Sequence, residues 1–205
     1  MAAPGTLRVL LAGAAGYGAG LLPSATLAAR LARRGEVDLR TSGSGNPGAT
    51  NAASLLGPGW GVAVLVLDMG KGAAAAALGR AVGGPAGGAA ASAASIAGHV
   101  FPAPSRFRGG KGVATSAGAS LVLFPAYFPL DAAVAYLSAT RTRDADRAIQ
   151  VSCAAWTAAA LVWWQRGLPN AWGPPPTASL PAFAALGSAV MLARLAVNRR
   201  LAAGR

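Results

Sequence analysis

The sequence predicts an all-α membrane protein, a polytopic transmembrane helix bundle of about seven segments that forms a single domain over residues 1–205. Apolar residues make up 54% of the chain and charged residues 12%, whereas soluble domains carry about a quarter charged residues. Several apolar runs reach the roughly 17–25 residues that a helix needs to cross the hydrocarbon core. The charges gather between these runs, as expected when the runs lie in lipid.

The apolar runs follow one another along the chain. The first covers residues 9–29 and contains Pro23, and the second and third cover 60–77 and 85–103. The run 113–140 contains Pro125 and Pro129, which favour two short helices joined by a turn at 125–129. Two more helices are predicted at 148–164 and 180–197. A signal peptide is an alternative for the first run, because Arg8 precedes it and small residues follow it.

Basic residues predict the orientation, because lysine and arginine collect in cytoplasmic loops. A single crossing over 113–140 would place two basic groups on opposite sides, whereas two short helices place all four on one side. We therefore predict seven segments, with the N-terminus outside and the C-terminus inside; six segments is the alternative. The four groups are Arg30, Arg33, Arg34 and Arg40; Arg106, Arg108 and Lys111; Arg141, Arg143 and Arg147; and Arg194, Arg199, Arg200 and Arg205.

Lysine is rare in this chain and has an unusual setting. Sixteen of the eighteen basic residues are arginine, and the two lysines, Lys71 and Lys111, each lie between two glycines. A compact ammonium beside backbone N–H groups that a ligand can approach closely is suited to binding phosphate. The pattern therefore predicts a phosphate site. We attribute the net charge of +12 to topology and to attraction for anionic lipid and substrates, not to nucleic acid.

A dense polar loop follows the first run at residues 41–51. It holds three glycines, two serines and two asparagines, and glycine N–H groups beside hydroxyls can form an anion-binding nest. Asn46, Pro47 and Gly48 favour a turn, and Thr50 or Asn51 can cap a following helix. An ordinary linker is the alternative, but the density of polar residues favours a functional loop.

The only histidine of the chain, His99, precedes a second glycine-rich loop at 109–112. A helix that begins after this loop would point its free N–H groups at a ligand. The loop is not a P-loop, because Ser105 stands where the first glycine should be and Gly112 replaces the residue that holds magnesium. Nucleotide hydrolysis is therefore disfavoured. A structural histidine is the alternative for His99, and the adjacent loop favours a functional one.

Asp68 and Lys71 lie within the second run at a spacing of three, so they can pair on one helix face. Charges at membrane depth usually face the bundle interior or a polar cavity. We interpret them as supporting residues of the site, with a purely structural pair as the alternative. One histidine, one cysteine and six scattered acids do not supply a usual metal site, so we expect no metal or other cofactor. Cys153 is expected to be a buried thiol.

Together these motifs resemble the bacterial acyl-phosphate:glycerol-3-phosphate acyltransferase family of the PlsY type. The resemblance covers about residues 16–115 through SGSGNPGATN (42–51), LDMGKG (67–72), GH (98–99) and FRGGKGVAT (107–115). It implies a seven-helix protein of the bacterial plasma membrane, with the motif loops on the cytoplasmic side. The implied reaction transfers a fatty acyl group from acyl phosphate to the 1-hydroxyl of glycerol 3-phosphate, giving lysophosphatidic acid and phosphate. This is the first step of phospholipid synthesis, and we expect a monomer.

The resemblance also implies residue roles. Acyl phosphate has a good leaving group, so the protein need only position two phosphates and stabilise charge. Lys111 would hold one phosphate, and His99 would accept the hydroxyl proton or donate to a phosphate, with a substrate phosphate as the alternative base. The predicted catalytic residues are Ser44, His99 and Lys111; the binding residues are Gly43, Gly45, Asn46, Thr50, Asn51, Arg108, Gly109, Gly110, Gly112 and Thr115; and the supporting residues are Asp68 and Lys71.

Three segments depart from the family pattern. Ser54 stands where the family usually has arginine, residues 141–144 replace the motif before the sixth helix, and the segment around Arg194 and Asn198 lacks the C-terminal His-Arg-Glu-Asn motif. Losing cations from a dianion site weakens catalysis unless Arg194 or Asn198 replaces them. The alternatives are therefore a catalytically weakened relative that binds lipid phosphate and a transporter of small phosphate esters, although we find no inverted repeat.

Overall fold

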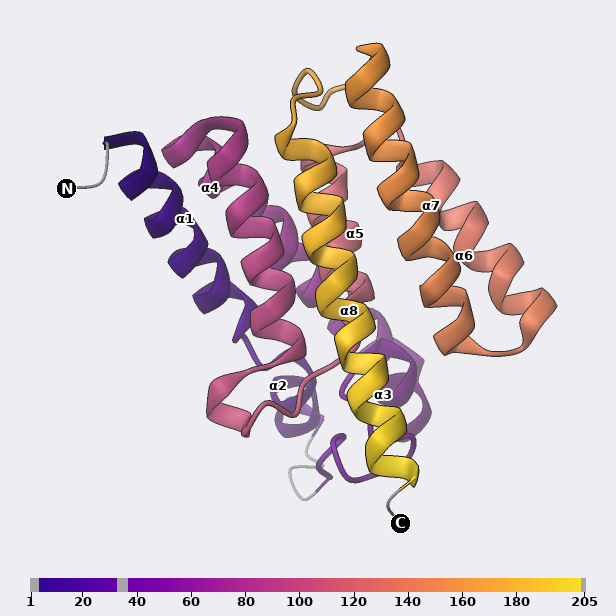
Figure 1. The fold of residues 1–205 in the computed structure, drawn as a ribbon. Helices are drawn as coiled ribbons and strands as arrows, with labels where there is room; N and C mark the ends of the chain where they lie inside the picture. The colour runs from indigo at the N-terminus through magenta and orange to yellow at the C-terminus, as the bar shows by residue number, and fades with distance from the viewer. Residues whose placement is uncertain (1–3, 33–36, 204–205) are drawn as a thin grey trace.

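The computed structural model describes residues 4–32 and 37–203, and the chain is built from helices and the loops between them (Figure 1). The all-α prediction is confirmed. The described part of the chain contains eight α-helices and a short 3₁₀ helix. They are α1 (Pro4–Gly20), α2 (Ser24–Leu31), α3 (Ala49–Leu56), α4 (Pro58–Val100), η1 (Ala103–Ser105), α5 (Val113–Leu123), α6 (Phe128–Thr142), α7 (Ala145–Arg166) and α8 (Ser179–Ala203).

The first apolar run, 9–29, is not one helix. α1 ends at Gly20 and α2 begins at Ser24, with Pro23 at its N-cap. Proline lacks an N–H and disfavours helical backbone in the residue before it, so the chain breaks at 21–23. α1 nevertheless belongs to the bundle, because the Tyr17 hydroxyl donates a hydrogen bond to the Phe101 carbonyl at 2.9 Å.

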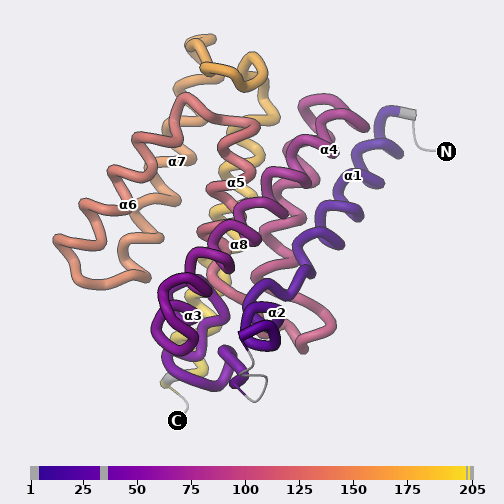
Figure 2. Tube along the Cα trace, turned by 180° about the vertical axis from the view of Figure 1, so that it is seen from behind, coloured from indigo at the N-terminus to yellow at the C-terminus, as the bar shows by residue number. Residues whose placement is uncertain are grey.

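The second and third predicted runs form the two arms of α4. Gly83 and Gly84 have non-helical backbone between the arms, and Pro85 begins the second arm. The φ of Gly84 is +64°, a left-handed value that glycine adopts without a steric penalty. Figure 2 shows α4 turning back here, with α1 beside it. The hairpin therefore brings residues of both arms to the same level of the bundle.

The first arm of α4 packs closely on α5. A Cβ atom at Gly72 would overlap the Thr115 carbonyl oxygen, and one at Gly118 would overlap the Met69 carbonyl. Small residues at such contacts are typical of helix association in lipid, where close backbone approach supplies the packing energy. These two glycines therefore set the separation of α4 and α5.

The run 113–140 is two helices, as predicted. α5 ends at Leu123 and α6 begins at Phe128, with Pro129 in its first turn. The main core cluster lies between α4, α5, α7 and α8, where the Trp156 and Phe183 rings meet edge to face at 4.9 Å. Cys153 is buried in this cluster, so the expectation of a buried thiol is confirmed.

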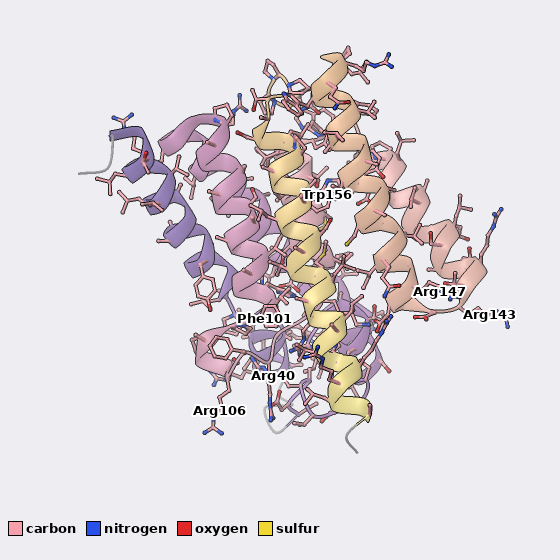
Figure 3. The ribbon with its side chains drawn as sticks, in the orientation of Figure 1. Arg40, Phe101, Arg106, Arg143, Arg147 and Trp156 are labelled. Atoms are coloured by element: carbon pink, nitrogen blue, oxygen red, sulfur yellow. The ribbon has the colours of Figure 1, made fainter. Side chains whose placement is uncertain are left out.

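Basic residues gather toward one end of the bundle. Figure 3 shows Arg40, Arg106, Arg143 and Arg147 toward the end where the C-terminus lies, and the N-terminus lies at the opposite end (Figure 1). Arg33, Arg34 and Arg205 of the predicted basic groups lie outside the described residues. Three described helical stretches are long and apolar enough to cross a membrane: Gly5–Leu31, Pro58–Ser105 and Ser179–Leu201.

Candidate active site

A pocket lies between the break that separates α1 from α2, the two arms of α4 and the loop before α5. It contains about 350 Å³ of empty space, part of which is open to solvent. Both backbone and charged side chains line it. The lining includes Leu22, Ser24, Arg40, Pro47, Asp68, Lys71, His99, Ser105, Gly109 and Gly110.

Three ionisable side chains form a buried cluster at the wall of this pocket. The Lys71 Nζ lies 2.8 Å from Asp68 Oδ1 and 2.8 Å from His99 Nδ1. It also donates a hydrogen bond to the Leu22 carbonyl at 3.2 Å. The Asp68 and Lys71 side chains are 3% exposed and His99 is 9% exposed. The predicted Asp68–Lys71 pair is confirmed, and the α4 hairpin adds His99 to it.

Arg40 directly precedes the first polar loop and contacts the segment before the second glycine loop, although the sequence motifs did not single it out as a site residue. Its guanidinium donates hydrogen bonds to Thr26 Oγ1 at 3.3 Å, Ser105 Oγ at 3.1 Å and the Arg108 carbonyl at 3.2 Å. Thr26 lies on α2, whereas Ser105 and Arg108 lie beside the second glycine loop. The sequence shows only that a basic residue precedes the first loop; its contacts depend on the fold.

Asn51 shapes the first polar loop from inside. Its Oδ1 accepts a hydrogen bond from the Ser44 N–H, and its Nδ2 donates to the Leu39 and Ser42 carbonyls, each at 3.0 Å. Asn51 is 4% exposed, and its amide is used for these hydrogen bonds. The prediction that Thr50 or Asn51 caps α3 is wrong, because the helix begins earlier, at Ala49, and has no side-chain cap.

Lys111 belongs to the second glycine loop but does not line the pocket. Its Nζ lies 2.6 Å from Asp146 Oδ1, and the two side chains are 25% and 28% exposed. Asp144 caps α7 by accepting hydrogen bonds from the N–H groups of Asp146 and Arg147, and these bonds lower the pKa of Asp144. Capping at Asp144 therefore fixes the turn that carries Asp146 to Lys111.

Of the predicted catalytic residues Ser44, His99 and Lys111, only His99 lines this pocket, and the grouping of the three at one site stays a prediction. Ser44 is exposed on its loop, and Lys111 is held by a carboxylate. Gly109 and Gly110 line the pocket, whereas Thr115 is fully buried on α5. The predicted residues outside the lining are Gly43, Ser44, Gly45, Asn46, Thr50, Asn51, Arg108, Lys111, Gly112 and Thr115.

Arg194 of α8 holds the loop before α5. Its guanidinium donates hydrogen bonds to the Phe107 carbonyl at 3.2 Å and the Gly109 carbonyl at 3.0 Å, and the residue is 8% exposed. Arg106 and Phe107 have φ values of 50° and 61°, which are uncommon for residues other than glycine. Arg194, which the sequence suggested as a replacement cation for substrate, thus binds protein carbonyls and supports this unusual backbone.

Relatives identify the family. The sequence model of the glycerol-3-phosphate acyltransferase family matches residues 10–204. The chain is 44% identical over 137 residues to the glycerol-3-phosphate acyltransferase of Desulforudis audaxviator (strain MP104C), covering 66% of this chain and 68% of that protein. It is 37% identical over 130 residues to glycerol-3-phosphate acyltransferase 1 of Moorella thermoacetica (strain ATCC 39073 / JCM 9320), covering 63% and 66%. The chain thus spans about two thirds of these relatives.

Solved structures agree with this assignment. The fold is similar to crystal structures of PlsY, an integral membrane glycerol 3-phosphate acyltransferase. The TM-score is 0.72 at 30% identity for its glycerol 3-phosphate form, and 0.74 at 27% for its lysophosphatidic acid form. Each match covers 96% of this chain and 93% of the other. The prediction made from the motifs is confirmed: this chain belongs to the glycerol-3-phosphate acyltransferase family, as an integral membrane acyltransferase with the PlsY fold.

Proposed function

We propose that this protein transfers a fatty acyl group from acyl phosphate to the 1-hydroxyl of glycerol 3-phosphate, giving lysophosphatidic acid and inorganic phosphate. The hydroxyl oxygen forms the new ester bond to the acyl carbon, and the bond from that carbon to the phosphate oxygen breaks. The hydroxyl proton passes to a base, which is a protein group or a substrate phosphate. The phosphate is a good leaving group, so positioning and charge stabilisation are the main tasks of the protein.

The meeting of the two polar loops at one pocket is the observation that carries this proposal. Pro47 of the first loop and Gly110 of the second line the pocket together with His99, and Arg40, next to the first loop, bonds to Ser105 and the Arg108 carbonyl next to the second. A guanidinium, an imidazole and glycine backbone around one cavity suit an anionic oxygen ligand. PlsY was solved in a glycerol 3-phosphate form and a lysophosphatidic acid form, which are the acceptor and product of this reaction.

We further propose seven crossings: α1, the two arms of α4, and α5 to α8. The N-terminus lies outside and the motif loops face the cytoplasm of a bacterial cell, because the labelled arginines gather at the loop end (Figure 3) and basic residues favour that side. α5 and α6 have 11 and 15 residues, so they cross while packed or tilted within the bundle. This orientation presents the pocket to soluble glycerol 3-phosphate and to lipid-soluble acyl donor.

The decisive experiment is acyl transfer by the purified protein in lipid nanodiscs. We expect lysophosphatidic acid from palmitoyl phosphate and glycerol 3-phosphate, and no product when palmitoyl-coenzyme A replaces the acyl phosphate. Product formed from palmitoyl-coenzyme A but not from palmitoyl phosphate would overturn the proposed donor.

One observation favours a second candidate, a relative that binds lipid phosphate and turns over slowly or not at all. Lys111 is engaged by Asp146 and Arg194 by loop carbonyls, so two cations expected at the phosphates already have protein partners. Calorimetric binding of glycerol 3-phosphate without product formation from acyl phosphate would support this candidate over the enzyme.

A further inference from the structure

We propose that Lys71 holds His99 as a neutral imidazole with its proton on Nε2, so that His99 donates a hydrogen bond to an anionic oxygen of the bound substrate and is not the base. The identity of that substrate rests on the proposed function. The protonation state of His99 does not, because it follows from the contacts of the ring in the folded protein.

The ammonium group of Lys71 determines which ring nitrogen carries the proton. An ammonium has three N–H donors and no lone pair, so a nitrogen within hydrogen-bond distance of it must be an acceptor. His99 Nδ1 lies 2.8 Å from Lys71 Nζ, and Nδ1 is therefore the unprotonated nitrogen. In neutral imidazole the proton then resides on Nε2. A doubly protonated ring would place an N–H against the ammonium, which is unfavourable.

Asp68 supplies the counter-charge for the Lys71 ammonium. Its Oδ1 lies 2.8 Å from Lys71 Nζ but 3.5 Å from His99 Nδ1, so the carboxylate is nearer to the lysine than to the imidazole. The three atoms form a triangle in which Lys71 Nζ is the nearer partner of His99 Nδ1 and Asp68 the more distant one, unlike an arrangement in which an acid is the nearest acceptor of the Nδ1 proton and makes the ring a base. Lys71 is therefore a positioning residue, and it acts on the reaction through His99.

The other side of the imidazole faces the second glycine loop. A Cβ atom at Gly110 would overlap His99 Nε2 and lie 2.9 Å from Cε1, so this edge of the ring packs against the backbone at Gly110. The Gly110 N–H donates to the His99 carbonyl at 3.2 Å, which ties the loop to the backbone of His99. In the described part of the chain Nε2 has no hydrogen-bond partner, and His99 and Gly110 both line the pocket.

This arrangement separates two roles that the sequence left open for His99. A base needs a lone pair directed at the hydroxyl, whereas here the nitrogen on the pocket side carries the proton. A donor fixed in place before the substrate arrives can stabilise charge that develops on a phosphate or carbonyl oxygen. The hydroxyl proton of the acceptor substrate must then pass to a group other than His99.

Nitrogen-15 NMR of the single histidine tests the inference without any activity measurement. His99 is the only histidine in the chain, so ¹⁵N-histidine-labelled, untagged protein in nanodiscs gives one pair of ring signals. Near neutral pH we expect an unprotonated Nδ1 and a protonated Nε2. In Lys71→Met, Asp68 becomes the nearest partner of Nδ1, and we expect the proton to move to Nδ1. A wild-type ring with its proton on Nδ1, or on both nitrogens, would overturn the inference even if no variant folds.

Acyl-transfer activity of two His99 variants tests the same inference by kinetics. Glutamine places an amide N–H near the position of Nε2, whereas asparagine places it near Nδ1. For a donor through Nε2, we expect His99→Gln to retain activity within about tenfold of wild type and His99→Asn to lose about 100- to 1,000-fold. Equal and severe losses in both variants, with folding confirmed by thermal unfolding, would contradict the donor role. If wild-type protein makes no product while the NMR result holds, the proposed function fails and the protonation state stands.

Discussion

Among single residues, Lys111 and Asp146 form the contact that decides whether the second glycine loop can bind phosphate directly. The Nζ–Oδ1 distance is 2.6 Å, and both side chains keep about a quarter of their surface exposed. Exposed ion pairs contribute little to stability, typically about 0–1 kcal/mol. A substrate phosphate with two negative charges can therefore displace Asp146 from Lys111 at small cost to the fold.

Removing this ammonium tests its role at the phosphate. We expect Lys111→Ala to lower kcat/KM for acyl transfer by about 100- to 1,000-fold, the usual loss of one preorganised charge, and Lys111→Arg to lose less. Asp146→Asn should lower KM for the substrate that binds there, because the competing carboxylate is gone. The matched control is Arg141→Gln, which removes an exposed cation from the same end of the bundle. Full activity in Lys111→Ala would exclude Lys111 from the site.

The buried pair in α4 predicts a different behaviour, in which stability and activity separate. Asp68→Asn leaves the Lys71 ammonium buried without its counter-charge, and we expect a loss of about 3–5 kcal/mol of unfolding free energy. The double variant Asp68→Leu/Lys71→Met should recover much of that stability, because an apolar pair of similar size replaces the ions. It should not recover acyl transfer, because His99 loses its partner. Thermal unfolding in detergent and the product assay measure the two effects, and an Asp68→Asn protein as stable as wild type would contradict the argument.

Among the elements, α8 positions the loop that precedes α5. The two carbonyls that Arg194 binds belong to Phe107 and Gly109, so a helix near the C-terminus supports a loop about 85 residues earlier in the chain. Arginine suits this role because its planar guanidinium presents several donors in a fixed geometry. α8 thus reaches the loop through the Arg194 side chain, which binds backbone carbonyls.

Substitution of Arg194 should weaken the hydrogen bonding of this loop and leave α8 folded. We expect Arg194→Met to increase hydrogen exchange at residues 106–112 and to lower kcat, because the Phe107 and Gly109 carbonyls lose their donor, and leaving the buried Gly109 carbonyl without one costs about 1–3 kcal/mol. Arg194→Lys should rescue only in part, since an ammonium lacks the planar fork. Arg199→Met, an exposed change on the same helix, serves as the control. If hydrogen exchange at residues 106–112 is unchanged in Arg194→Met, contacts other than those of Arg194 hold the loop.

The sequence predicted the elements better than their contacts. Pro125 and Pro129 indicated the α5–α6 turn, and the spacing of Asp68 and Lys71 indicated their pair, because both signals are local. His99 meets Lys71 across 28 residues, and Arg40 meets Arg108 across 68. These contacts depend on how the α4 hairpin and the loops pack, which periodicity and composition do not specify. Asp146 and Arg40 were missed as partners for the same reason.

At the scale of the whole molecule, the uneven distribution of charge relates the fold to the membrane. The loops that contact the pocket lie at the end toward which Figure 3 shows the labelled arginines, and the exposed surface includes many large apolar side chains such as Leu10, Val66 and Leu78. An apolar exterior is the pattern of a protein that sits in a bilayer, and the basic residues toward one end are the basis of the proposed orientation.

Cysteine labelling tests this orientation. In a Cys153→Ser background, we expect a membrane-impermeant maleimide to label Arg166→Cys in intact cells and Arg141→Cys only after the membrane is opened. Arg166 ends α7 and Arg141 lies in the last turn of α6, so the two positions bracket one crossing. Labelling of Arg141→Cys in intact cells would support the six-segment alternative, which places that residue outside.

The pairing of each lysine with a carboxylate bears on whether the donor substrate can acylate the protein. Acyl phosphates are reactive anhydrides that modify uncharged amines, and an amine becomes a nucleophile only when it loses its proton. Lys71 is enclosed against Asp68, and Lys111 is paired with Asp146, so the amine of each lysine is engaged by a carboxylate. The other sixteen basic side chains are guanidinium groups, which remain charged and unreactive. A chain with only two lysines, each paired with a carboxylate, therefore offers its donor substrate few amines to acylate.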